Sequence, residues 1–407
     1  MRIKPFKALH PSCELAAQVA AVPYDVVDTR EAAELARGNP WSFLHVTRPE
    51  IDLPPGTDSH AEAAYRQASE AFQMFRRQMI LQEEPRPCYY LYRLIMDGRM
   101  QTGLVACCAV DDYRDEIIKT HEKTRQDKED DRTRHIDQVN AHDEPIFITY
   151  RDRPEINAQV AAILATPPLY DFTPSDGIRN TLWRVDRTDA LTQAFACVPV
   201  AYIADGHHRS AASVRIAVER RKRESLPGLD REYNWFMAVI FPAGQLKILP
   251  YNRCVRDLNG LTSTQFLERL RAAGFAVTPR GSASPDQPGH VSVFLEGNWM
   301  DMAWPPVESR DPIASLDVTV LQERLLAPIL GIRDPRTDQR IEFVGGIRGT
   351  GELEERVRSG RSAVAFSMYP TLVEQMMAIA DAGQIMPPKS TWFEPKLRSG
   401  LFVHSLE

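Results

Sequence analysis

Apolar residues recur at helical spacing over residues 61–79, where they fall on one face of a helix. The residues on that face are Tyr65, Ala68, Phe72, Phe75 and Met79. This spacing is typical of an amphipathic helix packed on a core. A shorter helix is predicted over residues 29–36, because Gly38 and Pro40 close the pattern. The first part of the chain is therefore expected to be largely helical.

Two β-rich runs follow, over residues 89–96 and 103–110, and the Asp97-Gly98 dipeptide between them predicts a hairpin. Beyond the hairpin, strand-like and helix-like segments alternate. The pattern predicts strands over 145–150, 182–185, 239–241, 246–249, 291–295, 341–344 and 363–368, and helices over 156–164, 261–273, 352–359 and 372–382. Mixed segments of this kind predict an α/β (α+β) fold. Loops rich in Pro and Gly near 281–289 and 304–312 place a domain boundary around 250 to 280.

The composition of the chain narrows its class. With 407 residues and 43% hydrophobic content, it is long enough for two or three domains with buried cores. A net charge of −6 argues against a protein that mainly coats nucleic acid. No apolar run approaches the roughly twenty residues that span a bilayer, and the first residues lack the apolar part of a signal peptide. We therefore expect a cytoplasmic protein with no membrane or nucleic-acid partner.

The six cysteines form no C-x-x-C pair, and most lie in apolar surroundings. A Cys in such a setting behaves as a small buried hydrophobe. Neither a zinc site nor a disulfide framework is expected.

The segment 203–212 carries the clearest chemical signal in the chain. An apolar strand-like run turns through a glycine into a helical stretch, and this arrangement directs backbone N–H groups and the positive end of a helix dipole at one point. The residues at the turn are Asp205, Gly206, His207, His208 and Arg209. Gly lets the backbone approach an anion, and an Arg can hold a phosphate bidentately. The segment predicts a phosphate cradle, although Asp-Gly is also an ordinary turn with surface histidines beside it.

A second site is predicted directly after the hairpin. Thr120 is a plausible N-cap, which would place Glu122 in the first turn of the following helix. In one interpretation, Glu122 has no role beyond a favourable interaction with the helix dipole. Alternatively, it is a general base beside a phosphate site, with His121 or Lys119 near the transferring group.

A metal-dependent hydrolase is a third, less favoured interpretation. Its ligands would come from His121, Glu122, His135, His142, His207 and His208. No pair has the His-x-x-x-His spacing that puts two ligands on one helical face.

The segment 205–209 resembles the signature of the ParB/sulfiredoxin-like superfamily, in particular the branch of the free serine kinases. His121-Glu122 resembles the pair whose Glu is the catalytic base in the archaeal ADP-dependent enzyme of that branch. Two further matches follow in the same order. They are the Gly-Gly turn at 344–346 and a C-terminal series at 363–366, 369–371, Gly383, 386–391 and 393–396. The full length, with the segment 22–26, resembles the DUF1015 family.

The resemblance implies a ParB/sulfiredoxin-like, nucleotide-binding core over residues 85–254. The N-terminal extension 1–84 would pack on it, and the C-terminal α/β domain 255–407 would complete a cleft. Sulfiredoxins carry a Cys where this chain has His207, so repair of oxidised thiols is disfavoured. The N-terminal third has no counterpart in the compact kinases, and the sequence leaves monomer and homodimer open.

The activity implied by the resemblance is phosphoryl transfer from ADP or ATP to a small hydroxylated metabolite, with free L-serine the leading acceptor. Glu122 would accept the hydroxyl proton, with His121 beside it, and the segment 205–209 would hold the phosphates. Asp205 would hold Mg²⁺, directly or through water. The substrate or nucleotide pocket would include Lys389, Ser390 and Thr391. The alternative is a regulator that binds or hydrolyses nucleotide without small-molecule kinase activity.

Overall fold

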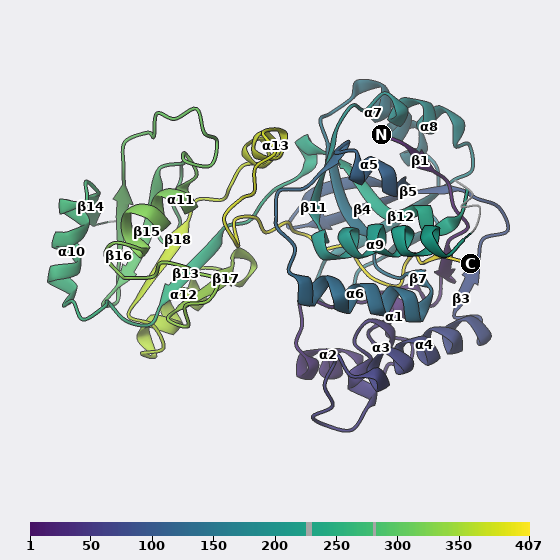
Figure 1. The fold of residues 1–407 in the computed structure, drawn as a ribbon, viewed down its shortest axis with the longest axis horizontal. Helices are drawn as coiled ribbons and strands as arrows, with labels where there is room; N and C mark the ends of the chain where they lie inside the picture. The colour runs from purple at the N-terminus through teal and green to yellow at the C-terminus, as the bar shows by residue number, and fades with distance from the viewer. Residues whose placement is uncertain (225–229, 280–281) are drawn as a thin grey trace. The chain divides into compact units, whose positions relative to one another are not determined.

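The computed structural model describes residues 1–224, 230–279 and 282–407. The chain forms two compact units (Figure 1). Unit 1 comprises residues 1–246 and 395–407, and unit 2 comprises residues 247–394.

Unit 1 is built on a mixed sheet of nine strands. The path of the sheet is β6-β11-β8-β12-β5-β4-β10-β9, with β1 paired to β5. Its strands are β1 (Ile3–Lys4), β4 (Tyr89–Met96), β5 (Arg99–Ala109), β6 (Ile118–Lys119), β8 (Ile146–Tyr150), β9 (Tyr170–Phe172), β10 (Arg179–Val185), β11 (Ala201–Asp205) and β12 (Trp235–Pro242). Most neighbouring strands are antiparallel, but β6 runs parallel to β11 and β8 parallel to β12.

Helices of unit 1 pack against this sheet. They are α5 (Val110–Arg114), α6 (Gln126–Val139), α7 (Pro154–Leu164), α8 (Asp189–Ala196) and α9 (His207–Arg223). Helices α6 and α9 lie side by side (Figure 1). The core joins buried residues of the sheet, such as Ile148 and Ile240, to Ile156, Phe195 and Ile216 of the helices. Burial of these large apolar side chains is the main stabilising contribution.

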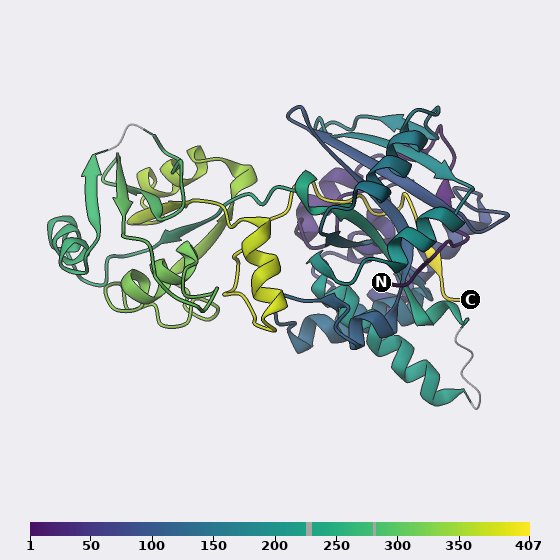
Figure 2. The same cartoon turned by 90° about the horizontal axis from the view of Figure 1, so that it is seen from above.

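The N-terminal residues form a second cluster within unit 1. Its elements are α1 (Ala16–Val19), α2 (Thr29–Ala36), α3 (Leu44–Thr47), α4 (Glu62–Arg77), and the paired strands β2 (Leu9–Pro11) and β3 (Leu81–Glu83). Phe43, Phe72 and Phe75 are fully buried there, and Val403 from the C-terminal tail packs among them. The tail also forms β19 (His404–Ser405), which pairs with β7 (Ala141–His142). Figure 2 shows the yellow tail running back among the purple N-terminal segments of this unit.

Unit 2 contains a six-stranded sheet in the order β14-β16-β15-β18-β13-β17. Its strands are β13 (Tyr251–Val255), β14 (Ala276–Pro279), β15 (His290–Leu295), β16 (Asn298–Ala303), β17 (Ile341–Gly345) and β18 (Val364–Met368). The helices are α10 (Ser263–Ala272), α11 (Asp317–Leu321), α12 (Gly351–Arg358) and α13 (Val373–Asp381), and α11 continues into η4, a π-helical turn (Gln322–Leu326). The neighbouring strands of this sheet are antiparallel among the residues that the structure describes.

The mixed α/β class predicted from the sequence is confirmed, and so is the hairpin. Asp97 and Gly98 both adopt positive φ, as a two-residue hairpin turn requires. The strand predicted over 246–249 is wrong. Ile248 makes only an isolated bridge to Phe393, because Pro242 and Pro250 flank a segment that begins with a 3₁₀ turn at 243–245. Across the described residues, no helix is long and apolar enough to cross a bilayer.

Candidate functional site

The end of β11 and the start of α9 form the predicted strand–glycine–helix turn. The pairing of β11 with β8 shifts register between Ile203 and Asp205. A bulge of this kind re-aims the side chains that follow it. Gly206 then adopts φ +89° at the N-cap of α9, a conformation that glycine adopts without strain. The first N–H groups of a 17-residue helix are therefore directed at this turn.

Glu122 reaches the same turn because β6 runs parallel to β11. Ala201 is paired with Ile118 and Tyr202 with Lys119. Parallel neighbours end at the same edge of a sheet, so the residues after β6 and those after β11 are brought together. The structure thus brings together the two segments that the sequence singles out. Arg125, just after the first segment, is hydrogen-bonded to His208 of the second, 83 positions later.

The local structure around Glu122 differs from the sequence prediction. Helix α6 begins at Gln126 with Arg125 as its N-cap, so Thr120 is not a cap and Glu122 does not lie in a first helical turn. The segment 120–125 is a loop, which His208 fastens by accepting a hydrogen bond from the backbone N–H of Arg125 at 3.2 Å. Because Glu122 is outside the helix, pairing with the dipole of α6 does not explain its position.

His207 lies between Glu122 and His121. Its Nδ1 is 3.6 Å from Oε2 of Glu122, and its ring meets the ring of His121 edge to face, with centroids 4.5 Å apart. Both rings are buried, whereas the Glu122 side chain is 34% exposed. Burial lowers the pKa of His207 to about 4 and that of His121 to about 3. Both imidazoles are therefore neutral near pH 7, and Glu122 is the accessible base of this group.

Asp205 is held by two cations. Lys396 donates to its Oδ1 at 2.8 Å, and Arg209 donates to its Oδ2 at 3.0 Å. Burial would raise the pKa of Asp205, but Lys396 and Arg209 together lower it to about 2. Asp205 is thus a fixed carboxylate at the edge of the turn.

Arg209 is buried rather than presented to solvent. Its side chain is 8% exposed, and Nη1 donates to the carbonyl of Pro145 at 2.8 Å. A Cβ on Gly206 would lie 3.1 to 3.2 Å from the guanidinium, so glycine permits the guanidinium to lie against the turn. In this position Arg209 secures Asp205 and the start of α9.

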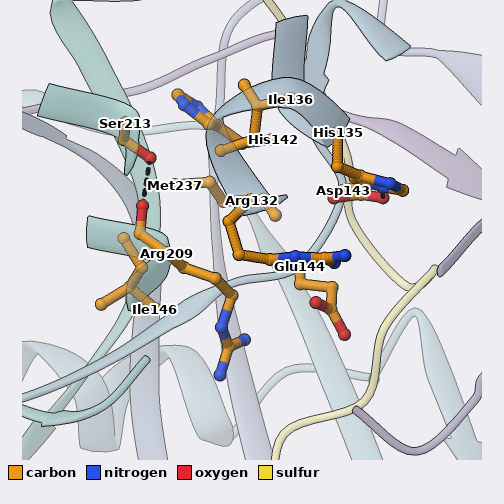
Figure 3. Close-up of a pocket in the computed structure, with 10 residues that line it drawn as sticks. All are labelled: Arg132, His135, Ile136, His142, Asp143, Glu144, Ile146, Arg209, Ser213 and Met237. Carbon is orange, nitrogen blue, oxygen red and sulfur yellow. Dashed lines mark hydrogen bonds and ion pairs between the residues drawn. The ribbon is translucent and has the colours of Figure 1, made fainter. Parts of the chain in front are cut away.

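Glu144 forms an anionic centre behind the turn. Burial raises the pKa of Glu144, and the guanidinium groups of Arg209 and Arg132, which it attracts, oppose this effect. These three residues line a cavity of about 10 Å³, close to the volume one water needs. Figure 3 shows the three side chains around this cavity, with Arg209 extending from the helix that also carries Ser213.

The sequence analysis missed the residues that support this centre. Oε1 of Glu144 accepts hydrogen bonds from the backbone N–H of Tyr24 at 3.0 Å and from the hydroxyl of Ser399 at 2.8 Å. The exposed carboxylate of Asp25 attracts Arg209 and His208. The sequence signal for Tyr24 and Asp25 is the resemblance of the segment 22–26 to a known family. Lys396 also lay within a noted motif, but nothing local connected it to Asp205.

The predicted residues Lys389, Ser390 and Thr391 lie in unit 2, in the segment that follows α13 in the chain. Lys389 is exposed, adopts φ +56° and places Nζ 5.4 Å from the ring centroid of Tyr251. Ser390 is buried, and its hydroxyl donates to the carbonyl of Pro387 at 2.6 Å. A ligand can therefore reach the side chain of Lys389 but not that of Ser390.

A resident metal centre is not formed by the described residues, which contain no group of three His, Cys, Asp or Glu side chains suited to hold an ion. The two oxygens of Asp205 already accept from cations. Its surroundings therefore fit a water-mediated contact with Mg²⁺ better than direct ligation.

Comparisons with known proteins place the chain as follows. The model of a family described as "Protein of unknown function (DUF1015)" matches residues 3–319. No curated protein matches by sequence. Among solved structures, a mutant free serine kinase in complex with ADP is 13% identical with a TM-score of 0.36, and the match covers 73% of this chain and 92% of that one.

Two further solved structures are similar to the chain. SbnI of Staphylococcus aureus, truncated at its C-terminus, is 12% identical with a TM-score of 0.40, over 74% of this chain and 86% of that one. A conserved hypothetical protein from Pyrococcus furiosus is 14% identical with a TM-score of 0.34, over 73% and 94% of the two chains.

Proposed function

Because the chain belongs to the DUF1015 family, whose description assigns no function, we propose a function from its own residues. The protein is a phosphotransferase that moves a phosphoryl group from ADP or ATP to the hydroxyl of a small metabolite, with free L-serine as the leading acceptor. It is related to the free serine kinases of the ParB/sulfiredoxin-like superfamily.

The observation that carries this proposal is an accessible carboxylate beside a helix N-terminus. Glu122 lies 3.6 Å from His207, the first residue of α9. The helix terminus favours a phosphate, and the carboxylate can accept the proton of a hydroxyl that attacks it. Phosphoryl transfer needs mainly positioning and charge neutralisation, which is what such a pair supplies.

Each residue of the site has a role in this proposal. The N–H groups at the start of α9, from Gly206 to Arg209, bind the phosphates. Glu122 accepts the acceptor's proton, and the buried ring of His121 holds His207 in place through their edge-to-face contact. Lys396 and Arg209 keep Asp205 ionised. Lys389, Ser390 and Thr391 contribute to the substrate or nucleotide pocket.

Mg²⁺ enters this proposal with the nucleotide. Mg²⁺ in phosphoryl-transfer sites keeps several waters and is held by substrate phosphates together with one or two carboxylates. Asp205 would contact the ion through water. The ion would neutralise charge on the phosphates, while the chain's own groups position the acceptor.

The test is a product screen with the full-length protein. The protein is incubated with Mg²⁺, with ADP or ATP, and with a panel of amino acids and polyols, and phosphorylated products are identified by mass. We expect O-phosphoserine, its loss in Glu122→Gln, and its retention in Glu116→Gln, which changes an exposed Glu of the same region. Nucleotide binding without any phosphorylated acceptor would instead support the regulatory function.

A further inference from the structure

Unit 2 contains a cavity that no step of the proposed function uses. Its volume is about 210 Å³, well above the roughly 10–15 Å³ that one water needs. Arg253 of β13 and Arg336 line it, together with the apolar side chains of Leu326, Phe343 and Pro388. All of its lining residues lie between 253 and 388, so the cavity belongs to unit 2 alone.

Arg253 is an unusual lining residue because it is a buried cation without an anionic partner. It is only 4% exposed. Its Nη1 and Nη2 donate to the backbone carbonyls of Tyr251 and Lys389, the latter at 3.1 Å. Among the described residues, no carboxylate forms an ion pair or hydrogen bond with it. A guanidinium has five N–H donors, so these two bonds leave donors for another acceptor.

The energetic consequence is that this charge is uncompensated. Burial lowers the pKa of Arg253 to about 10, and Tyr251 is the one group that opposes this effect. Buried charges in folded proteins are normally paired, because removing them from water costs free energy that only a partner offsets. A ligand anion in the cavity would supply that partner.

The sheet fixes the geometry of this cation. Arg253 is paired with Phe343 across β13 and β17, so the two side chains lie on one face of the sheet. The guanidinium carbon is 5.4 Å from the ring centroid of Phe343. A planar group held against a ring in this way is pre-organised to bind a carboxylate or phosphate bidentately.

The element η4 forms another part of the lining. This π-helical turn contributes Gln322 and Leu326 to the lining, and the N–H of Ala327 donates to the carbonyl of Gln322 at 3.0 Å, five residues earlier. Single π-turns within helices occur frequently at functional sites. The lining also includes the exposed residues Asp334 and Arg336, so its charged side chains are two guanidinium groups and one carboxylate.

We propose that this cavity binds a small organic anion, a carboxylate or phosphate monoester with an apolar portion, through Arg253 and Arg336. The anionic group pairs with the guanidinium of Arg253, and the apolar portion fills the space beside Leu326, Phe343 and Pro388. This is the composition of ligand sites in general, which are mainly apolar with a few convergent polar groups. The site stands independently of phosphoryl transfer.

The test is calorimetric titration of the full-length protein, without nucleotide, against benzoate, phenyl phosphate and neutral benzyl alcohol. We expect benzoate or phenyl phosphate to bind with a Kd of about 1 mM or lower. The preferred anion of the two identifies the natural headgroup. Benzyl alcohol should bind at least about ten-fold more weakly, since it cannot form the charge-assisted bonds.

Two variants of one loop give a matched comparison. Arg336→Glu reverses a lining charge at an exposed position, and Arg333→Glu makes the same change three residues away, outside the lining. Arg336→Glu should weaken anion binding by about ten-fold or more, while Arg333→Glu should change it by less than about two-fold. Both positions are exposed, so neither change should prevent the protein from folding.

The role of the buried Arg253 is tested by Arg253→Lys, which keeps the positive charge and loses the planar guanidinium. It should weaken anion binding, with little effect on benzyl alcohol. The proposal is overturned if neither anion binds, if benzyl alcohol binds as tightly as the anions, or if Arg336→Glu and Arg333→Glu lose affinity equally.

Discussion

Lys396 donates a hydrogen bond to Asp205 at 2.8 Å, although the two residues are 191 positions apart in the chain. Lys396 belongs to the C-terminal segment 395–407, which returns to unit 1 after the whole of unit 2. The contact therefore connects the end of the chain to the turn before α9. The Lys396 and Asp205 side chains are 16% and 26% exposed, so water screens the pair only in part.

We predict that Lys396→Met lowers the free energy of unfolding at pH 7 by about 1–3 kcal/mol, because Asp205 loses one of its two cations. The pKa of Asp205 is depressed in the fold, to about 2 from 3.8. Its contribution to stability is therefore present above pH 3.8 and is lost as pH falls toward 2. Urea denaturation at pH 7 measures the effect.

The control for this prediction is Lys222→Met, which removes an exposed lysine from the end of α9 in the same unit. A change of an isolated surface charge usually alters stability by less than about 0.5 kcal/mol. If the two variants unfold at the same urea concentration, the Lys396–Asp205 pair contributes nothing measurable.

Glu122→Gln tests the proposed general base. The amide keeps the shape of the side chain but cannot accept the proton, so kcat for phosphoryl transfer should fall by roughly 10²–10⁴-fold with little change in nucleotide affinity. Glu122 is 34% exposed and outside any helix, so the melting temperature should stay close to that of the wild type. A variant with normal turnover would exclude Glu122 as the base.

The individual elements of the site could be predicted from the sequence, but the proximity of Glu122 to the start of α9 could not. The apolar run before Asp205 and the glycine after it are local signals, and they predicted the strand and the start of α9. The proximity of Glu122 depends on β6, which has only two residues and leaves no hydrophobic period to detect. The predicted helix start at Thr120 is wrong for another reason: Thr is also common in turns, and the helix begins only at Gln126.

The role of Arg209 also lies beyond local pattern. An Arg after Gly-His-His suggests a phosphate ligand, but its burial is set by Pro145, which lies 64 positions earlier, and by the neighbouring Glu144. Burial and pairing with distant carboxylates are tertiary properties. For the same reason, the convergence of Tyr24 and Ser399 on Glu144 could not be read from either segment alone.

A pH dependence of stability follows from the buried histidines. The pKa values of His207 and His121 are lowered to about 4 and about 3 in the fold, against 6.5 for a free imidazole. Below pH 6.5 the unfolded chain holds protons that the folded chain lacks. The free energy of unfolding therefore falls as pH drops from 6.5 to 4, by up to about 1.4 kcal/mol per pH unit for each histidine.

His207→Gln should make this pH dependence shallower, since it removes one of the buried histidines whose pKa is lowered. Denaturation at several pH values between 4 and 7 measures the slope. His60→Gln, which changes an exposed histidine of the same unit, should leave the slope as it is in the wild type. An unchanged slope in His207→Gln would mean that His207 is not held neutral by burial.

Two variants of Lys389 distinguish a role in ligand binding from a role in folding. Lys389 adopts φ +56°, where a residue with a Cβ is strained by about 1–2 kcal/mol and glycine is not. Lys389→Gly should therefore be more stable than Lys389→Ala, although both lack the ammonium. If this ammonium binds substrate or nucleotide, both variants should raise KM by about ten-fold, the loss expected for one charge-assisted contact. Lys247→Ala, an exposed change in the same unit, should leave KM unchanged. A normal KM in Lys389→Gly, with only the stability altered, would show that Lys389 affects the stability of the loop and does not contact the ligand.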